Sequence, residues 1–468
     1  MDKKILMLDD MTPSMIVKEL DKYIIGQTEA KKTLAVAIRS RSRRKKLPDA
    51  LRDEIAPRNI IMIGPTGVGK TEIARRISRL ANAPFVKVEA TKYTEVGYVG
   101  RDVESMVRDL MGVAVQMVNK ELADQQEDTV KQRVEDRLLD LLLPVASSEP
   151  VPVFRDGRQI GADQPAGQVN PSSQKLLREQ MRSQLREGSL DETLVDFTVS
   201  PKKPAVGIDM MGMGNMEDIQ QAMNSLGSIF GNKASTHKKL TVKRAKEIIT
   251  EEELEKIVDQ DKVLEIAKER TEQMGIIFID EIDKVAGNSG KGSGPDVSRE
   301  GVQRDLLPIV EGTKVTTKWG LIDTTHILFI AAGAFHLSKP SDLIPELQGR
   351  FPLRTELSDL TAEDFYRILQ EPQNAIMKQY CALLETEGVT VVFTDDALRR
   401  ISDLAYEVNA TNENIGARRL YTIMEKLLED LSFNASDLSG QTISITPAYV
   451  DEKLGQIVQD PDLSRYIL

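Results

Sequence analysis

The chain is poor in the residues that build metal centres and disulfide frameworks. It has one cysteine, Cys381, and three histidines among 468 residues. A single cysteine excludes an internal disulfide and a four-cysteine zinc module, and it fits a reducing compartment. The histidines show no HExxH spacing, so a zinc hydrolase would lack its ligands. We therefore expect a cytoplasmic protein whose chemistry does not depend on zinc.

Aromatic residues and long apolar runs are also scarce. Aromatic residues make up 4% of the chain, which disfavours a stacking platform for single-stranded nucleic acid. The net charge of −11 argues against a general polyanion-binding surface. The longest apolar run, Ile327 to Phe335, is too short to cross a membrane. The apolar patch Ile5 to Leu8 is too short for a signal peptide. We expect neither nucleic acid nor a membrane as a partner.

The strongest motif present is a phosphate-binding loop, Gly64-Pro-Thr-Gly-Val-Gly-Lys-Thr71. It follows an apolar strand pattern, 59–63, and precedes an amphipathic helix pattern, 70–81, which is the context such a loop requires. Its glycines let backbone N–H groups face phosphate oxygens, and the helix N-terminus adds a favourable partial charge. Lys70 is expected to reach the β- and γ-phosphates of a nucleotide, and the Thr71 hydroxyl to hold Mg²⁺.

A second apolar strand pattern ends in two acids, in Gly275-Ile-Ile-Phe-Ile-Asp-Glu281. Open α/β sheets place their ligand sites at the carboxyl ends of the strands. Asp280 is expected to hold the Mg²⁺ shell through water, and Glu281 to orient and deprotonate the attacking water. Together with the Gly64 loop, this pair predicts nucleotide hydrolysis.

The distance between these two motifs predicts an inserted domain. Lys70 and Asp280 are about 210 positions apart, far more than one crossover needs. The intervening chain carries charged helical patterns, repeated Pro and Gly breaks and no strong strand alternation, which indicates a helical insertion with mobile loops. We predict a large α/β domain formed by residues 1–115 and 268–357, an intermediate domain at 116–267, and a helical and α+β small domain at 358–468.

Two segments leave alternatives open. Gly97-Tyr-Val-Gly100 is either an ordinary turn that packs Tyr98 inward or a mobile loop that grips a substrate. The basic run 39–46 is either a solvated helix end or a nucleic-acid contact.

Taken together, the motifs resemble the HslU (ClpY) family, the AAA+ ATPases of the bacterial HslUV protease. The resemblance covers nearly the whole chain, although the insertion matches in position more than in residues. It implies an AAA+ P-loop NTPase core with a mainly helical insertion and a C-terminal small domain. The segments that carry it are Gly64–Thr71, Gly97–Met106, Phe278–Lys284, Pro345–Arg350, Ile415–Leu420 and Asp462–Leu468.

The resemblance also implies a role for individual residues, with ATP and Mg²⁺ as cofactors. Ile25 would contact the adenine, Arg418 would act as a second sensor, and Arg350 would be an arginine finger for a neighbouring subunit, with Glu346 near that nucleotide. The strand near 331 offers no polar first sensor. The remaining sets would bind phosphate and Mg²⁺ (Gly67, Val68, Gly69, Lys70, Thr71, Glu72), line a substrate pore (Gly97, Tyr98, Val99, Gly100) and dock a peptidase (Leu463, Tyr466, Ile467, Leu468).

The expected function is an ATP-driven unfoldase with a role in the stress response. A hexameric ring would recognise unfolded or tagged proteins and thread them into a separate HslV-type peptidase, without peptidase activity of its own. Two alternatives remain at this point. A ClpX-type unfoldase is disfavoured by the long insertion and by the lack of an N-terminal cysteine cluster. An AAA+ nucleic-acid motor is supported by the basic run and opposed by the acidic total charge.

Overall fold

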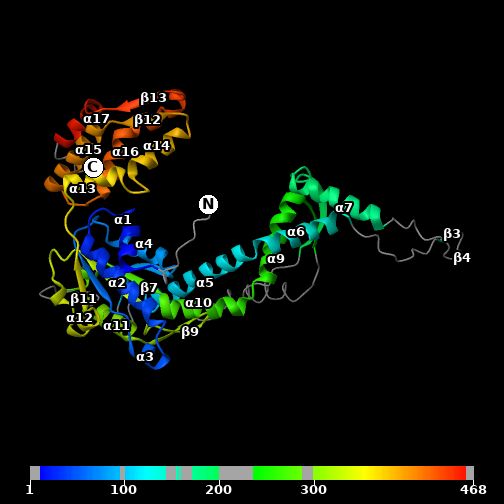
Figure 1. Cartoon of the computed structure of the whole chain (residues 1–468), viewed down its shortest axis with the longest axis horizontal. Helices are drawn as coiled ribbons and strands as arrows, with labels where there is room; N and C mark the ends of the chain where they lie inside the picture. The colour runs from blue at the N-terminus through cyan, green and yellow to red at the C-terminus, as the bar shows by residue number, and fades with distance from the viewer. Residues whose placement is uncertain are drawn as a thin grey trace, which may run out of the picture. The chain divides into compact units, whose positions relative to one another are not determined.

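The computed structural model describes residues 11–94, 101–143, 154–155, 158–159, 171–199, 236–286 and 299–459. The chain forms two compact units, one made of residues 119–260 and the other of the two flanking segments, which we call the insertion unit and the main unit. Figure 1 shows the elements of both. None of the helices among the described residues is both long and apolar enough to span a bilayer.

A five-stranded parallel sheet organises the main unit. Its strand order is β11-β1-β10-β7-β2, and every neighbouring pair is parallel. The three central strands are almost wholly buried, as their continuous Ile, Phe and Ala runs predict for a sheet covered on both faces. The strands are β1 (Ile60–Ile63), β2 (Phe85–Glu89), β7 (Ile276–Asp280), β10 (Leu328–Gly333) and β11 (Leu353–Glu356).

Helices before and after the phosphate-binding loop cover one face of this sheet. Leu34 and Ile38 of α2 and Ile73 and Ile77 of α4 pack in one apolar cluster with alternate residues of the central strands, such as Phe278. The helices and the hairpin of this α/β part are α1 (Pro13–Asp21), α2 (Thr28–Arg44), α3 (Asp49–Glu54), α4 (Lys70–Leu80), α10 (Gln260–Met274), α11 (Arg299–Glu311), β8 (Lys314–Thr317), β9 (Gly320–Asp323) and α12 (Pro345–Arg350).

The C-terminal part of the main unit is a helical layer with two short strands. Thr361 and Asp364 form the expected capping box at the start of α13. The expected helix near 416–433 is α16, whose apolar face is fully buried. The elements are α13 (Ala362–Gln370), α14 (Ile376–Glu385), β12 (Thr390–Phe393), α15 (Asp395–Thr411), α16 (Arg418–Phe433), β13 (Thr442–Ile445) and α17 (Pro447–Gln459), with β12 and β13 parallel.

The insertion unit is mainly helical, as expected, but it also contains strands that its sequence did not predict. β5 (Leu194–Val199) and β6 (Thr236–Thr241) form an antiparallel pair, and Val195 and Phe197 of β5 point into the unit's apolar core. A shorter pair joins β3 (Phe154–Arg155) and β4 (Arg158–Gln159). The helices are α5 (Ser105–Gln125), which begins in the main unit, α6 (Glu127–Leu142), α7 (Pro171–Arg186) and α9 (Val242–Ile257).

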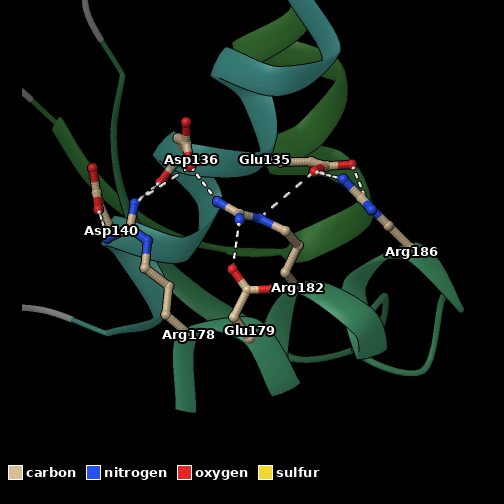
Figure 2. A network of polar contacts seen from close by, with 7 residues as sticks. All are labelled: Glu135, Asp136, Asp140, Arg178, Glu179, Arg182 and Arg186. Atoms are coloured by element: carbon tan, nitrogen blue, oxygen red, sulfur yellow. Dashed lines mark hydrogen bonds and ion pairs between the residues drawn. The ribbon is translucent and has the colours of Figure 1, made fainter. Parts of the chain in front are cut away.

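Ion pairs hold α7 against α6. Arg178, Arg182 and Arg186 stand one turn apart on α7 and reach carboxylates of α6 (Figure 2). Arg186 makes two bonds with Glu135, at 3.0 and 2.8 Å. Spacing of four residues places these side chains on one face of the helix, which explains why a polar helix docks here.

Candidate nucleotide site

The phosphate-binding loop connects β1 to α4, and its glycines are required by geometry. Gly67 and Gly69 have φ of +77° and +103°, which side-chain-bearing residues rarely adopt. A Cβ on Gly67 would also lie 1.9 Å from the carbonyl oxygen of Ile415. The Ala417 N–H donates to the Gly67 carbonyl at 3.1 Å. The loop is therefore in direct backbone contact with the segment that precedes α16.

Lys70 begins α4 and is nearly buried. Its ammonium donates to the carbonyl of Pro65 at 2.7 Å and to that of Gly64. Burial lowers the pKa of Lys70, while the carboxylates of Asp280 and Asp283 oppose that shift. A desolvated cation facing the loop is suited to bind phosphate, because the charge is poorly screened by water.

The acidic pair lies at the carboxyl end of β7, next to the loop. The ammonium of Lys87 on β2 is 2.8 Å from Asp280 Oδ2. β2 pairs with β7, and Lys87 lies opposite Phe278, two residues before Asp280, so the contact runs diagonally across the two strands. Glu281 has φ of +57°, an uncommon backbone conformation that directs the chain away from the strand. The Thr91 hydroxyl donates to Glu281 Oε2 at 3.4 Å.

A cleft of about 1000 Å³ unites these elements. Its walls come from both the α/β part and the C-terminal part of the main unit. The predicted residues that line it are Ile25, Gly67, Val68, Gly69, Lys70, Thr71, Glu72, Asp280, Glu281 and Arg418. The volume is in the range of small-molecule and cofactor sites.

The Mg²⁺ that such a site would hold fits the residues present. Thr71 and Asp280 both line the cleft and would supply a hydroxyl and a carboxylate to the ion. Mg²⁺ is commonly held by one or two carboxylates together with phosphate and water. No cluster of three or more His, Cys, Asp or Glu that could hold a metal occurs in the described segments.

Several residues of the cleft were not predicted from the sequence. Tyr23 lines it beside the buried Ile25, and the Arg76 guanidinium lies 4.0 Å from the centre of the Tyr23 ring. The Tyr23 hydroxyl donates to Gln373 at 2.8 Å. Lys87 also lines the cleft. The sequence shows a basic residue in the strand expected after the loop helix, but it does not show that this residue contacts Asp280.

The two adjacent arginines at the start of α16 have different surroundings. Arg418 is exposed and lines the cleft. Arg419 is buried and donates to Asn409 Oδ1 at 3.1 Å and to the Glu413 carbonyl at 2.8 Å. Burial lowers the pKa of Arg419, and Glu413 opposes the shift. Only the first of the pair can therefore approach a ligand in the cleft.

Two predicted residues lie outside the cleft. Arg350 and Glu346 are exposed on α12. The Arg350 guanidinium is 3.0 Å from Glu311 Oε1 and remains half exposed. The predicted pore residues Gly97, Tyr98, Val99 and Gly100 and the tail residues Leu463, Tyr466, Ile467 and Leu468 fall outside the residues that the structure describes.

At Arg41 and Arg44, the basic run 39–46 is neither a solvated helix end nor a nucleic-acid contact. Arg41 is buried and donates to the carbonyls of Met274 and Gly275 at 3.0 and 3.1 Å. Burial lowers the pKa of Arg41 to about 9. Arg44 is buried and donates to Gln273 Oε1 at 2.8 Å. Arg41 binds the junction between α10 and β7, and Arg44 binds α10, so these two side chains are neither solvated nor available to nucleic acid.

Comparison with known families confirms the predicted fold class. An AAA domain of the dynein-related subfamily matches residues 59–109. An AAA domain of the Cdc48 subfamily matches residues 201–354. The two matches include the phosphate-binding loop and the acidic strand, respectively.

Relatives that match nearly the whole chain identify a more specific family than the AAA domain. The ATP-dependent protease ATPase subunit HslU of Treponema denticola is 57% identical over 481 residues, covering 98% of this chain and 99% of the relative. HslU of Persephonella marina is 54% identical, and the ATPase subunit ClpY of Bacillus subtilis is 50% identical, each with the same coverage. This chain belongs to the HslU (ClpY) family of ATPase subunits of ATP-dependent proteases.

Proposed function

We propose that this AAA+ ATPase recognises unfolded or tagged proteins. It uses ATP and Mg²⁺ to unfold them and to thread them into a separate HslV-type peptidase. The active form is a homo-oligomeric, hexameric ring in the cytoplasm. The predicted division into 1–115, 116–267, 268–357 and 358–468 assigns hydrolysis to the first and third segments and nucleotide sensing to the fourth.

The residues of the cleft divide the hydrolytic work. Lys70 and the loop N–H groups hold the phosphates, and Thr71 and Asp280 hold the metal shell. Glu281 accepts a proton from the attacking water, and its hydrogen bond with Thr91 fixes the carboxylate. Glu72, in the phosphate-binding set, forms a 2.6 Å ion pair with Arg76, whose guanidinium lies over the Tyr23 ring.

One observation carries the proposal of a ring. Arg418 lines the cleft of its own chain, whereas Arg350 is exposed on α12, outside that cleft. An exposed arginine that belongs to no site of its own chain is suited to complete the site of a neighbour. Head-to-tail contacts of this kind form a ring when the rotation between subunits closes.

Mixed rings test this arrangement. Arg350→Ala lacks the finger but keeps its cleft, and Lys70→Ala lacks the cleft but keeps the finger. Each protein alone should be nearly inactive, because arginine fingers contribute on the order of 10³ to 10⁵ in rate in related GTPases. A mixture should regain ATPase activity above the sum of the two. Activity that never exceeds that sum would contradict action between subunits.

Unfolding is tested separately at the predicted pore. Tyr98→Ala should keep basal ATPase activity and lose the unfolding of a folded, tagged protein, while Tyr98→Phe should retain it, because a ring grips a chain without its hydroxyl. Equal loss of every activity with a lower melting temperature would instead indicate a core residue. Deletion of Leu463 to Leu468 should abolish peptidase stimulation and leave ATP hydrolysis in place.

The rival proposal of a nucleic-acid motor has less support at two positions of the basic run. Its best evidence was the basic run, and Arg41 and Arg44 are committed to carbonyl groups within the fold. Stimulation of ATPase activity by an unfolded protein and not by DNA is the expected outcome.

A further inference from the structure

Two buried amide side chains connect the two ends of α12, the helix that ends at Arg350, to the strands behind the nucleotide cleft. Asn59 precedes β1 and Gln303 lies on α11, and both are almost fully buried. Buried amides are costly unless they are hydrogen-bonded, so their partners indicate what they fix in place.

Asn59 fixes the C-terminal end of α12. Its side-chain N–H donates to the Arg350 carbonyl at 3.0 Å, and its side-chain oxygen accepts from the Phe329 N–H of β10 at 3.0 Å. Its own carbonyl accepts from the Leu353 N–H at 3.3 Å. One residue therefore joins the backbone of Arg350 to two central strands, β1 and β10.

Gln303 fixes the N-terminal end of the same helix. Its side-chain oxygen accepts from the N–H of Ile344, the residue before α12, at 2.8 Å. Its side-chain N–H donates to the carbonyl of Val285 at 2.7 Å. Val285 follows the short turn after Glu281, so this amide links α12 to the chain that leaves the acidic strand.

We propose that Asn59 and Gln303 are positioning residues for the arginine finger, and that they transmit the state of one subunit's cleft to the Arg350 it presents to the next. The inference rests on the proposed role of Arg350. α12 has only six residues, and its one buried side chain is Leu347. So short a helix has little packing of its own, and the two amides hold the backbone at both of its ends, in addition to the Arg350–Glu311 ion pair.

The test uses full-length Asn59→Leu and Gln303→Met proteins, which keep side-chain size and remove both bonds. Each should bind a fluorescent ATP analogue as the parent protein does, because neither residue lines the cleft. Each should lose ATPase turnover by on the order of tenfold to hundredfold, since displacement of a catalytic group by about 1 Å can cost about 10²-fold.

Mixed rings provide a readout that a purely structural defect would not produce. Asn59→Leu or Gln303→Met subunits should regain activity when mixed with Lys70→Ala subunits, which supply intact fingers. They should gain nothing from Arg350→Ala subunits, which share the same deficiency. In a 1:1 ring about one site in four would combine an intact cleft with an intact finger.

Gln27→Met is the matched control. Gln27 is also buried, and its amide also donates one bond and accepts one, to and from Ser358, at 2.9 and 3.1 Å. None of these atoms belongs to α12. A Gln27→Met protein that keeps its nucleotide affinity should therefore respond equally to the two partners.

The outcomes separate this inference from the proposed function. If Arg350→Ala and Lys70→Ala fail to complement each other, the finger role itself is wrong and this inference falls with it. If that pair complements but Asn59→Leu and Gln303→Met respond equally to both partners, the finger stands and the positioning role is wrong. Weakened nucleotide binding with unchanged turnover would also overturn the positioning role.

Discussion

The sheet of the main unit and the α6–α7 contact of the insertion unit are held together by different forces. The three central strands are buried Ile, Phe and Ala runs, whose stabilisation comes from apolar burial and is insensitive to salt. Among residues 176–186 of α7, only Leu185 is buried, and the contact with α6 consists largely of ion pairs (Figure 2). Screening weakens such pairs. The nucleotide site therefore lies on the part that apolar burial holds together, whereas the strength of the α6–α7 contact depends on salt.

The largest expected effect is a loss of ATP hydrolysis in the main unit with its packing unchanged. Glu281→Gln should lower ATP turnover on the order of 10²- to 10⁴-fold, because the proton acceptor is lost while the side-chain shape remains. Nucleotide affinity and melting temperature should stay near those of the parent. The measurement pairs steady-state hydrolysis with titration of an ATP analogue.

Lys70→Ala supplies the contrast, since it removes the group that faces the phosphates and should abolish binding as well. Near-normal turnover in Glu281→Gln would assign the base to another residue.

The next largest effect is a loss of stability when the apolar packing of the central sheet is disrupted. Phe278 on β7 is fully buried in the cluster that includes α2 and α4. Phe278→Ala should lower the free energy of unfolding by about 3–5 kcal/mol, because the lost contacts leave a cavity. Nucleotide binding should decline together with the folded fraction in denaturant titrations. A stable Phe278→Ala protein without nucleotide binding would contradict this reasoning.

The same substitution in the insertion unit sharpens the comparison. Phe197 on β5 is equally buried, but in a separate apolar cluster formed by α6, α7, α9 and the β5–β6 pair. Phe197→Ala should destabilise that unit by a similar amount, about 3–5 kcal/mol. Nucleotide binding should persist, since no cleft residue belongs to residues 119–260. Limited proteolysis with and without an ATP analogue would locate the damage, and cleavage in both units would argue against their independence.

Local patterns predicted the parts of the fold that depend on neighbours in the sequence. The Gly64 loop, the acidic strand end and the α16 stripe are local in this sense, and each lies where its pattern indicated. Sheet order, by contrast, depends on distant pairing, so Lys87 beside Asp280 could not be foreseen. Arg41 shows the same limit, because a charge run gives no sign that one member donates to carbonyls more than 230 positions away.

The β5–β6 pair was missed for a related reason. Its strands are well separated in the sequence, and β6 reads Thr-His-Lys-Lys-Leu-Thr, which carries little apolar alternation. β5 buries the alternate residues Val195 and Phe197. Half of a hairpin signal is too weak to distinguish a strand from a loop.

The smallest expected effect concerns the ion pairs between α6 and α7. Arg182 contacts Asp136 at 2.7 Å and Glu179 at 3.1 Å, and its side chain is about three-quarters covered. Arg182→Ala should weaken the docking of α7 by roughly 0.2–1 kcal/mol, the range measured for exposed pairs, since Arg178 and Arg186 remain in place. Lys131→Ala is the control, because the Lys131–Glu127 pair lies within α6 and does not join the two helices.

The measurement is amide hydrogen exchange of residues 171–186 at about 0.1 M and about 1 M salt, where the Debye length falls from about 10 to about 3 Å. Exchange should rise with salt in the parent protein, and less in Arg182→Ala, which has fewer pairs to screen. Exchange in residues 276–280 should not change, because apolar burial holds that strand. Salt-independent exchange in α7 would show that Leu185 and its apolar neighbours, and not the arginines, dock the helix.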